Sequence, residues 1–302
     1  MPQPLHPVFR PGATALITGA ASGIGLATAQ FCRTHGMNLI LVDNNKEALE
    51  TAASTLPSSS NSTTTTTHHM DVSNLSDWQT LHTTLTTTTH PEGIDLLFLN
   101  AGASIQPTPT TEGHKNPWKD ATYFQRTLAI NTLGYTNGIA TFIDDITSKH
   151  ETPSAKAIIL TGSKQGITNP PGNDPAYNAS KAAVKSIAEQ LSYTLYNEKH
   201  ANVSVHLLIP GFTYTGLVKR YFTEKPAGAW MPEQVVEYLS EGMAEGRFYI
   251  VCPDNEVSEE LDKKRMLWAC GDVVFGRPAL TRWREDWKER AARGVEEMEI
   301  SQ

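Results

Sequence analysis

The sequence predicts an α/β fold: one doubly wound domain built on a mostly parallel sheet of about seven strands, followed by a helical C-terminal extension. Two observations support this prediction. Short apolar runs recur along the chain, and most are continuous rather than alternating, which is typical of strands that helices cover on both faces. Helix-like segments lie between the runs, so we expect parallel strands that end at a common edge, where such sheets bind ligands.

The expected strands follow one another at regular intervals. They are the runs Thr14–Ile17, Leu39–Val42, His68–Val72, Asp95–Leu99, Ala157–Leu160, Val203–Ile209 and Phe248–Val251. The helix-like segments between them are Ile24–His35, Lys46–Leu56, Trp118–Ser148 and Ala176–His200. Two stretches rich in Thr, Ser58–Thr67 and Thr83–Thr89, cannot build a core, so we expect them to be solvated surface between elements.

Length and composition favour a single large domain. With 302 residues, the chain suits one α/β domain over residues 1–254 and an extension over residues 255–302 that packs on the same domain or on a neighbouring subunit. The net charge of -7 provides no basic surface for nucleic acid, and no apolar run approaches the roughly 20 residues that cross a membrane. Three distant cysteines favour a reducing, cytoplasmic setting. No Cys or His cluster has metal-ligand spacing, so we expect no metal.

The first strand leads into a glycine-rich turn, Thr18–Gly25, which opens the next helix. Such a turn lets the backbone approach a pyrophosphate, and the helix N-terminus supplies free N–H groups and a positive dipole end. Glycine turns also occur in purely structural loops, but the position between a strand and a helix favours nucleotide binding. The expected contacts come from Gly19, Ser22, Gly23, Ile24 and Gly25.

Asp43 stands at the end of the second strand run. Its carboxylate can accept hydrogen bonds from a ribose 2′-hydroxyl and would repel a 2′-phosphate, so NAD is favoured as the cofactor over NADP. Two alternatives stay open. Asp43 could serve only to cap the following helix, or the nearby Lys46 could favour NADP.

Tyr177 and Lys181 are four residues apart in a strongly helical segment, so they share one helix face. A cation there stabilises a phenolate and lowers the pKa of the tyrosine towards neutral pH, as a general acid/base requires. By itself this spacing is commonplace, and a surface tyrosine beside a solvated lysine is the alternative. Ser163, which closes the fifth strand, favours the catalytic interpretation.

These motifs, taken together, resemble the short-chain dehydrogenase/reductase family. That family's pattern has a glycine turn, an Asn-Ala-Gly, a helix asparagine, a serine, a Tyr-x-x-x-Lys and a Pro-Gly. All occur here in order, at Thr18–Gly25, Asn100–Gly102, Asn131, Ser163, Tyr177–Lys181 and Pro210–Gly211. The resemblance covers roughly Ala13 to Val251 and implies a Rossmann fold.

The resemblance implies a role for each matched residue. Tyr177 is the acid/base, Lys181 lowers its pKa and binds the nicotinamide ribose, and Ser163 orients the substrate oxygen. Asn131 holds a water in a proton relay or braces its helix near the fourth strand, and both roles can coexist. Asn100 lines the adenosine or ties neighbouring strands together. Further cofactor contacts are implied for Asp71, Val72, Ala101, Gly102, Thr213 and Thr215.

The predicted activity is hydride transfer between NAD and a small-molecule secondary alcohol or ketone. Aromatic residues in the segment Tyr214–Trp230, which we expect to be a mobile lid, favour a lipophilic or cyclic substrate. The candidate substrate-pocket residues are Ser104, Ile105, Gln165, Phe212, Tyr214 and Leu217. Two alternatives remain: an NADP-preferring ketoreductase, and a non-catalytic protein that senses dinucleotides on the same fold.

The chain departs from the family pattern after the last strand. The usual Asp-Gly-Gly is replaced by Cys252–Asn255, and an extension follows. Within it, Leu280, Trp283 and Trp287 recur at helical spacing, which predicts an amphipathic helix that docks over the pocket or on a neighbouring subunit. The alternative is a helix packed on the sheet away from any site. The family resemblance also implies a homodimer or homotetramer, paired through the helices that carry the matched asparagine and tyrosine.

Overall fold

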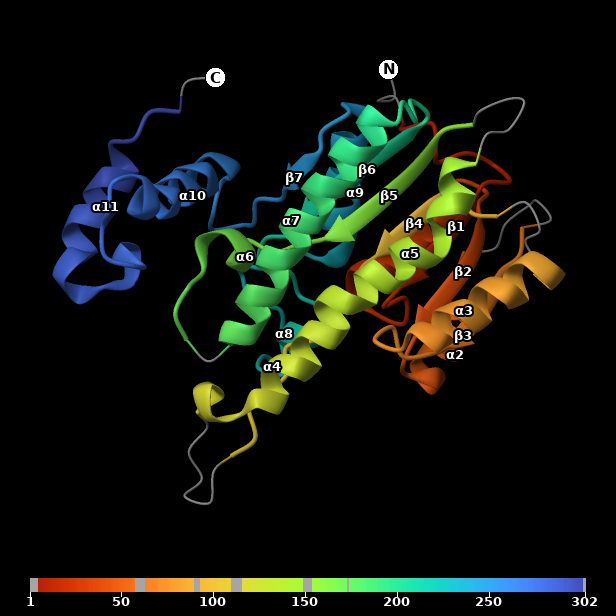
Figure 1. Cartoon of the computed structure of the whole chain (residues 1–302), viewed down its shortest axis with the longest axis horizontal. Helices are drawn as coiled ribbons and strands as arrows, with labels where there is room; N and C mark the ends of the chain where they lie inside the picture. The colour runs from red at the N-terminus through yellow and green to blue at the C-terminus, as the bar shows by residue number, and fades with distance from the viewer. Residues whose placement is uncertain are drawn as a thin grey trace.

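A seven-stranded sheet forms the centre of the molecule, in the order β3-β2-β1-β4-β5-β6-β7 (Figure 1). The computed structural model describes residues 5–57, 63–89, 93–109, 116–148, 154–172 and 174–300. Every strand pair is parallel. The strands are β1 Thr14–Thr18, β2 Asn38–Asp43, β3 Thr65–His69, β4 Leu96–Leu99, β5 Lys156–Thr161, β6 Val203–Ile209 and β7 Tyr249–Val251. The predicted doubly wound α/β fold is therefore confirmed.

Helices cover both faces of the sheet, and each face has its own apolar core. One core includes residues of α1 (Gly23–Thr34), α2 (Lys46–Ser54) and α9 (Pro232–Ala244). The other includes residues of α3 (Leu75–Thr84), α5 (Gly134–Thr147) and α7 (Pro175–Asn197). Because β1 pairs with β2 on one side and with β4 on the other, the chain switches faces there, and a crevice opens at the carboxyl edge. Within the described ranges, no helix is long and apolar enough to cross a membrane.

Three local predictions need correction. The segment Trp118–Ser148 is not one regular helix, because a 3-10 turn (Pro117–Lys119) and α4 (Ala121–Leu128) lead into a π-helical stretch, Ala129–Leu133, before α5. The third strand begins at Thr65 rather than His68, since β-branched threonines fit a half-buried edge strand. The second Thr-rich stretch continues α3 as a π-helical turn, Leu85–Thr89. Of the first stretch, Thr65–Thr67 belong to β3 and not to a connection between elements, and residues 58–62 lie outside the described part.

The C-terminal extension forms a small helical unit with its own apolar cluster. It consists of α10 (Glu259–Val274) and α11 (Lys288–Glu296), which bury Trp268, Ala291 and Val295 between them. The predicted continuous helix through Leu280, Trp283 and Trp287 is wrong. Leu280 has a φ of 60°, and two 3-10 turns follow it, Thr281–Trp283 and Glu285–Trp287. In Figure 1 the extension lies at the end of the molecule nearest α6 (Gln165–Thr168), away from the sheet.

Candidate active site

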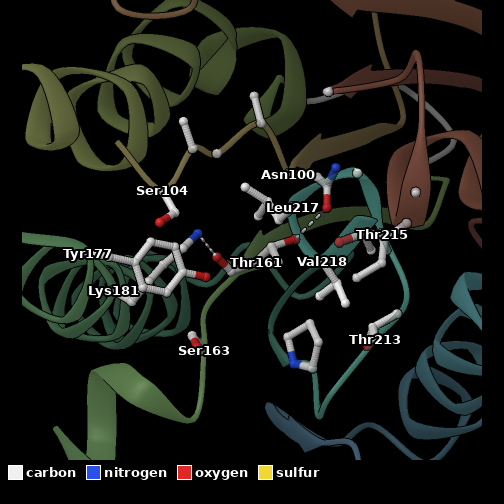
Figure 2. A pocket seen from close by; sticks show the side chains of 18 of the residues that line it. Asn100, Ser104, Thr161, Ser163, Tyr177, Lys181, Thr213, Thr215, Leu217 and Val218 are labelled. Atoms are coloured by element: carbon white, nitrogen blue, oxygen red, sulfur yellow. Dashed lines mark hydrogen bonds between the residues drawn. The ribbon is translucent and has the colours of Figure 1, made fainter. Parts of the chain in front are cut away.

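A cavity of about 1010 Å³ opens at the carboxyl edge of the sheet, between the ends of the strands and α7 (Figure 2). Nearly all of the predicted site residues line it. They are Gly19, Ser22, Gly23, Ile24, Asp43, Asp71, Val72, Asn100, Ala101, Gly102, Ser163, Tyr177, Lys181, Thr213 and Thr215. Gly25 and Asn131 do not line the cavity, and both lie behind its wall.

The glycine turn forms a cradle that side chains would fill. Gly19 and Gly23 have φ values of +66° and +55°, which favour glycine. A Cβ added at Gly25 would lie 2.1 Å from the carbonyl oxygen of Gly19, so only glycine allows this close approach. Helix α1 begins at Gly23, and the Ser22 side chain makes no capping hydrogen bond to it. The N-terminus of α1 therefore presents its first amides towards an anion at the cavity.

Asp43 faces the glycine turn rather than capping the next helix. Its Oδ2 accepts a hydrogen bond from the Ala21 amide at 3.0 Å, and its Oδ1 accepts one from the Asn45 amide at 3.0 Å. The cap of α2 is Asn45, whose Oδ1 accepts from the Ala48 amide. Lys46 pairs with Glu50 at 4.0 Å on the exposed side of α2. The capping alternative is thus excluded, and the carboxylate of Asp43 lines the cavity.

Asn100 joins neighbouring strands and also lines the cavity. Its amide nitrogen Nδ2 donates to the Thr18 carbonyl at 3.2 Å, and its Oδ1 accepts from the Thr161 hydroxyl at 3.2 Å. These bonds connect the ends of β1 and β5 across β4. The position of Asn100 is therefore compatible with both roles predicted from the sequence, lining the adenosine and tying neighbouring strands together.

Asn131 braces the loop after β4 against α7. It lies fully buried in the π-helical stretch, where its Oδ1 accepts from the Ala103 amide at 2.8 Å. Its Nδ2 donates to the Ala103 carbonyl at 2.9 Å and to the Ser180 hydroxyl at 3.1 Å. The side chain thus performs the bracing role that the sequence left open.

Tyr177, Lys181 and Ser163 meet at one end of the cavity (Figure 2). The Lys181 Nζ donates to the Thr161 carbonyl at 2.7 Å and to the Tyr135 hydroxyl at 3.3 Å. It lies 5.8 Å from the centre of the Tyr177 ring. Burial lowers the pKa of Lys181 to about 7. An ammonium that titrates near neutral pH can both hold and release a proton here.

The pKa of Tyr177 differs from the sequence expectation. Burial raises it above the ordinary value, a hydrogen bond with Ser163 lowers it, and the negative charge of Asp174 raises it. Because burial is the largest of these effects, the pKa of Tyr177 is raised and not lowered as the sequence predicted.

The chain as a whole has relatives among known proteins. The chain matches the short chain dehydrogenase family over residues 13–226. It belongs to the short-chain dehydrogenase/reductase family. Mouse (Mus musculus) 15-hydroxyprostaglandin dehydrogenase [NAD(+)] is 28% identical over 250 residues, which cover 83% of this chain and 84% of that protein. The short-chain dehydrogenase/reductase PhomF of Diaporthe leptostromiformis is 28% identical over 222 residues, covering 70% of this chain and 74% of that protein.

A solved structure extends the similarity to the fold. A short-chain dehydrogenase/reductase from Burkholderia phymatum, in complex with NAD, superposes with a TM-score of 0.74 at 26% identity. The similarity covers 89% of this chain and 96% of that chain. Members of this family are oxidoreductases, so the prediction that the chain is an oxidoreductase is confirmed.

Sequence reasoning missed one residue at the centre of this short-chain dehydrogenase site. Asp174 caps α7, and its Oδ1 accepts from the Tyr177 amide at 3.2 Å and from the Tyr123 hydroxyl at 2.8 Å. Its Oδ2 accepts from the Ser104 hydroxyl. The Asp-Pro pair at Asp174 and Pro175 is a helix-start signal that could have identified it.

The substrate end of the cavity agrees in part with the sequence prediction. Ser104, Gln165, Phe212 and Leu217 line the cavity. Ile105 and Tyr214 were also expected there, but neither is a lining residue of the cavity. The Tyr214 hydroxyl instead donates to the Thr223 carbonyl at 2.8 Å, inside the expected lid segment. Tyr221 and Phe222, two of the aromatic residues of the expected lid segment, do line the cavity.

Proposed function

We propose that this protein is an NAD-dependent dehydrogenase or ketone reductase of small secondary alcohols, with Tyr177 as the acid/base. The observation that carries the proposal is the convergence of Ser163, Tyr177 and Lys181 in one cavity with the glycine cradle. A non-catalytic dinucleotide sensor would need only the cradle. The intact tyrosine, lysine and serine therefore favour an enzyme.

The residues at the cradle fit a dinucleotide. A Cβ added at the glycines of the turn would press against neighbouring atoms, so only glycine keeps the turn this tight. The uncapped start of α1 suits a pyrophosphate. The Asp43 carboxylate suits the ribose hydroxyls and disfavours a 2′-phosphate, which supports NAD over NADP. Thr213 and Thr215, on the segment after β6, would hold the nicotinamide end. When bound, the nicotinamide supplies or accepts the hydride.

The chain's own residues would then transfer the proton to or from the substrate oxygen. In the oxidative direction Tyr177, as the phenolate, takes the proton of the substrate hydroxyl while Ser163 orients that oxygen. The Lys181 ammonium, 5.8 Å from the centre of the Tyr177 ring, would favour the phenolate against the burial that raises the pKa of Tyr177. The Lys181 pKa of about 7 would let this group pass a proton on near neutral pH. In the reductive direction Tyr177 donates the proton to the substrate oxygen.

An apolar wall at the other end of the cavity supports a lipophilic substrate. Phe212, Tyr221 and Phe222 line it, together with Leu217 and Val218. These side chains offer contact area but few hydrogen-bond partners, which disfavours a sugar. One of the relatives is named as a hydroxyprostaglandin dehydrogenase, which supports a lipophilic alcohol.

The test compares wild type with Tyr177→Phe on a panel of cyclic and lipophilic secondary alcohols, following absorbance at the nicotinamide band. We expect the variant to lose about 10²–10⁴-fold in turnover, as general acid–base catalysis typically contributes. NADH binding, measured by tryptophan fluorescence, should stay largely unchanged. Tyr193→Phe is the matched control, because Tyr193 lies exposed on the same helix.

Two results would count against the proposal. Turnover of Tyr177→Phe within a few-fold of wild type would exclude Tyr177 as the acid/base. NADH binding by wild type without turnover of any alcohol or ketone on the panel would favour the dinucleotide sensor instead.

A further inference from the structure

A buried ionic cluster lies directly beside the catalytic serine. It consists of Lys164, Asp254 and Asp262, and we name it the Lys164 cluster. The Lys164 Nζ lies 3.3 Å from Asp254 Oδ2 and also pairs with Asp262 Oδ2. The side chains of both aspartates are 6% exposed, and that of Lys164 is 16% exposed. Lys164 lines the active-site cavity, so the cluster forms part of its wall.

One carboxylate of the cluster holds the substrate wall. Asp254 Oδ2 accepts a hydrogen bond from the Phe212 amide at 3.1 Å. The segments that follow β6 and β7 are in contact, since a Cβ added at Gly211 would lie 2.6 Å from the Pro253 carbonyl oxygen. Burial works against the charged form of Asp254, but the Phe212 amide and the Lys164 charge together lower its pKa. Asp254 therefore stays ionised and joins the ends of β6 and β7.

The other carboxylate comes from the C-terminal extension. Asp262 lies in the first turn of α10, and α10 packs against α6. Helix α6 in turn lies against the catalytic helix, because a Cβ added at Gly166 would lie 2.5 Å from the Lys181 carbonyl carbon. Burial raises the pKa of Asp262 and the charge of Asp254 adds to this rise, whereas Lys164 and Arg265 lower it. The extension is thus connected to the chain beside Ser163 by the Asp262–Lys164 pair, and to the helix of Lys181 by the packing of α10 on α6.

Removing either end of this cluster has a predictable consequence. Without Lys164, two buried carboxylates would face each other with no cation between them. Without the charge of Asp262, α10 would lose its ionic contact with Lys164, while the Lys164–Asp254 pair and the Tyr238–Glu259 hydrogen bond would persist. Breaking a buried ion pair is costly because it leaves a charge without its partner. The structure would relax by moving α6 and the Phe212 segment.

We propose that Lys164 is a positioning residue through which the C-terminal extension holds Ser163 and the Phe212 wall in place for substrate. This inference rests on the proposed function only for its kinetic readout. It explains the departure from the family pattern after β7, because Asp254 and the extension supply the two carboxylates. The extension therefore contributes to substrate binding although none of its described residues lines the cavity.

The kinetic test uses the full chain and the variant Asp262→Asn. The matched control is Asp286→Asn, because Asp286 is an exposed carboxylate of the same extension that pairs with Arg284. We expect Asp262→Asn to lose about tenfold in kcat/KM, mainly through a higher KM for the alcohol, with NADH affinity within twofold of wild type. Asp286→Asn should stay within twofold in every constant.

Variants of Lys164 separate positioning from a general loss of stability. Lys164→Arg keeps the cation and should retain most of the activity, whereas Lys164→Met should lose more than Asp262→Asn. The double variant Lys164→Met/Asp262→Asn should lose less than the product of the two single effects, because both break the same contact. Independent, multiplicative effects would overturn the proposal.

A second measurement does not depend on turnover. Amide hydrogen exchange in the protein without ligands should become about tenfold faster over residues 163–168 and 211–217 in Asp262→Asn, and not in Asp286→Asn. If wild type turns over no alcohol, the proposed function fails while this exchange result still tests the inference. Unchanged exchange in both segments would show that the cluster does not position them.

Discussion

Replacing Gly25 by alanine tests the dinucleotide cradle most directly. The added Cβ would lie 2.1 Å from the Gly19 oxygen, 2.8 Å from the Gly19 carbonyl carbon and 2.9 Å from Asn100 Nδ2. Ordinary contact begins at 3.4 Å, so the backbone of the turn would have to move by more than about 1 Å. Gly19 has a φ of +66°, which limits how the turn can relax. The start of α1 would therefore move away from the pyrophosphate position.

The expected magnitude follows from the hydrogen bonds lost. A hydrogen bond to a charged group contributes about 1.5–3 kcal/mol, so losing one or two raises the Kd for NADH at least about tenfold, or ~1.4 kcal/mol. The assay is a tryptophan fluorescence titration with NADH, with circular dichroism to verify folding. Gly12→Ala is the control for backbone strain, because Gly12 has a positive φ of +80° and its Cβ would meet nothing within 4 Å.

Gly12→Ala should lower the melting temperature by backbone strain and leave the NADH affinity unchanged. The reasoning would be refuted if Gly25→Ala bound NADH within threefold of wild type. It would equally be refuted if both alanine variants lost affinity to the same extent, because the effect would then be general strain.

Three further predictions concern cofactor choice, proton linkage and assembly. Wild type should prefer NADH over NADPH by at least roughly tenfold, or ~1.4 kcal/mol, and Asp43→Ser should narrow that gap; equal affinities in wild type would contradict the role of Asp43. The pKa of Lys181 is lowered to about 7, so between pH 7 and its ordinary value near 10.5 the unfolded chain binds more protons, and stability should rise with pH by up to about 1.4 kcal/mol per unit. In denaturant unfolding, the stability of Lys181→Met should lack this rise with pH. If the stabilities of wild type and variant changed in parallel with pH, the contribution of Lys181 would be excluded. Light scattering should show a homodimer or homotetramer, since Leu133 and Tyr193 are exposed on the elements that carry Asn131 and Tyr177; a monomer at micromolar concentration would contradict this.

The sequence by itself determined the sheet, the glycine turn and the placement of Tyr177 and Lys181 on one helix face. Each depends on short-range information. A strand such as β6 is a continuous apolar run, the glycine turn follows a strand directly, and Tyr177 and Lys181 are one helical turn apart. Periodicity and turn chemistry act within a few residues, so they can be recognised without knowing what packs against them.

Only the tertiary structure decided how the polar side chains are used. Lys164 and Asp254 are 90 residues apart in the chain, and Ser104 and Asp174 are 70 apart, so no local pattern links them. The predicted helix through Trp283 failed for the same reason, because Asp272 holds the Thr281 amide and hydroxyl in a turn at Leu280. A buried charge requires its partner wherever the fold brings one, and this long-range constraint overrides helical spacing.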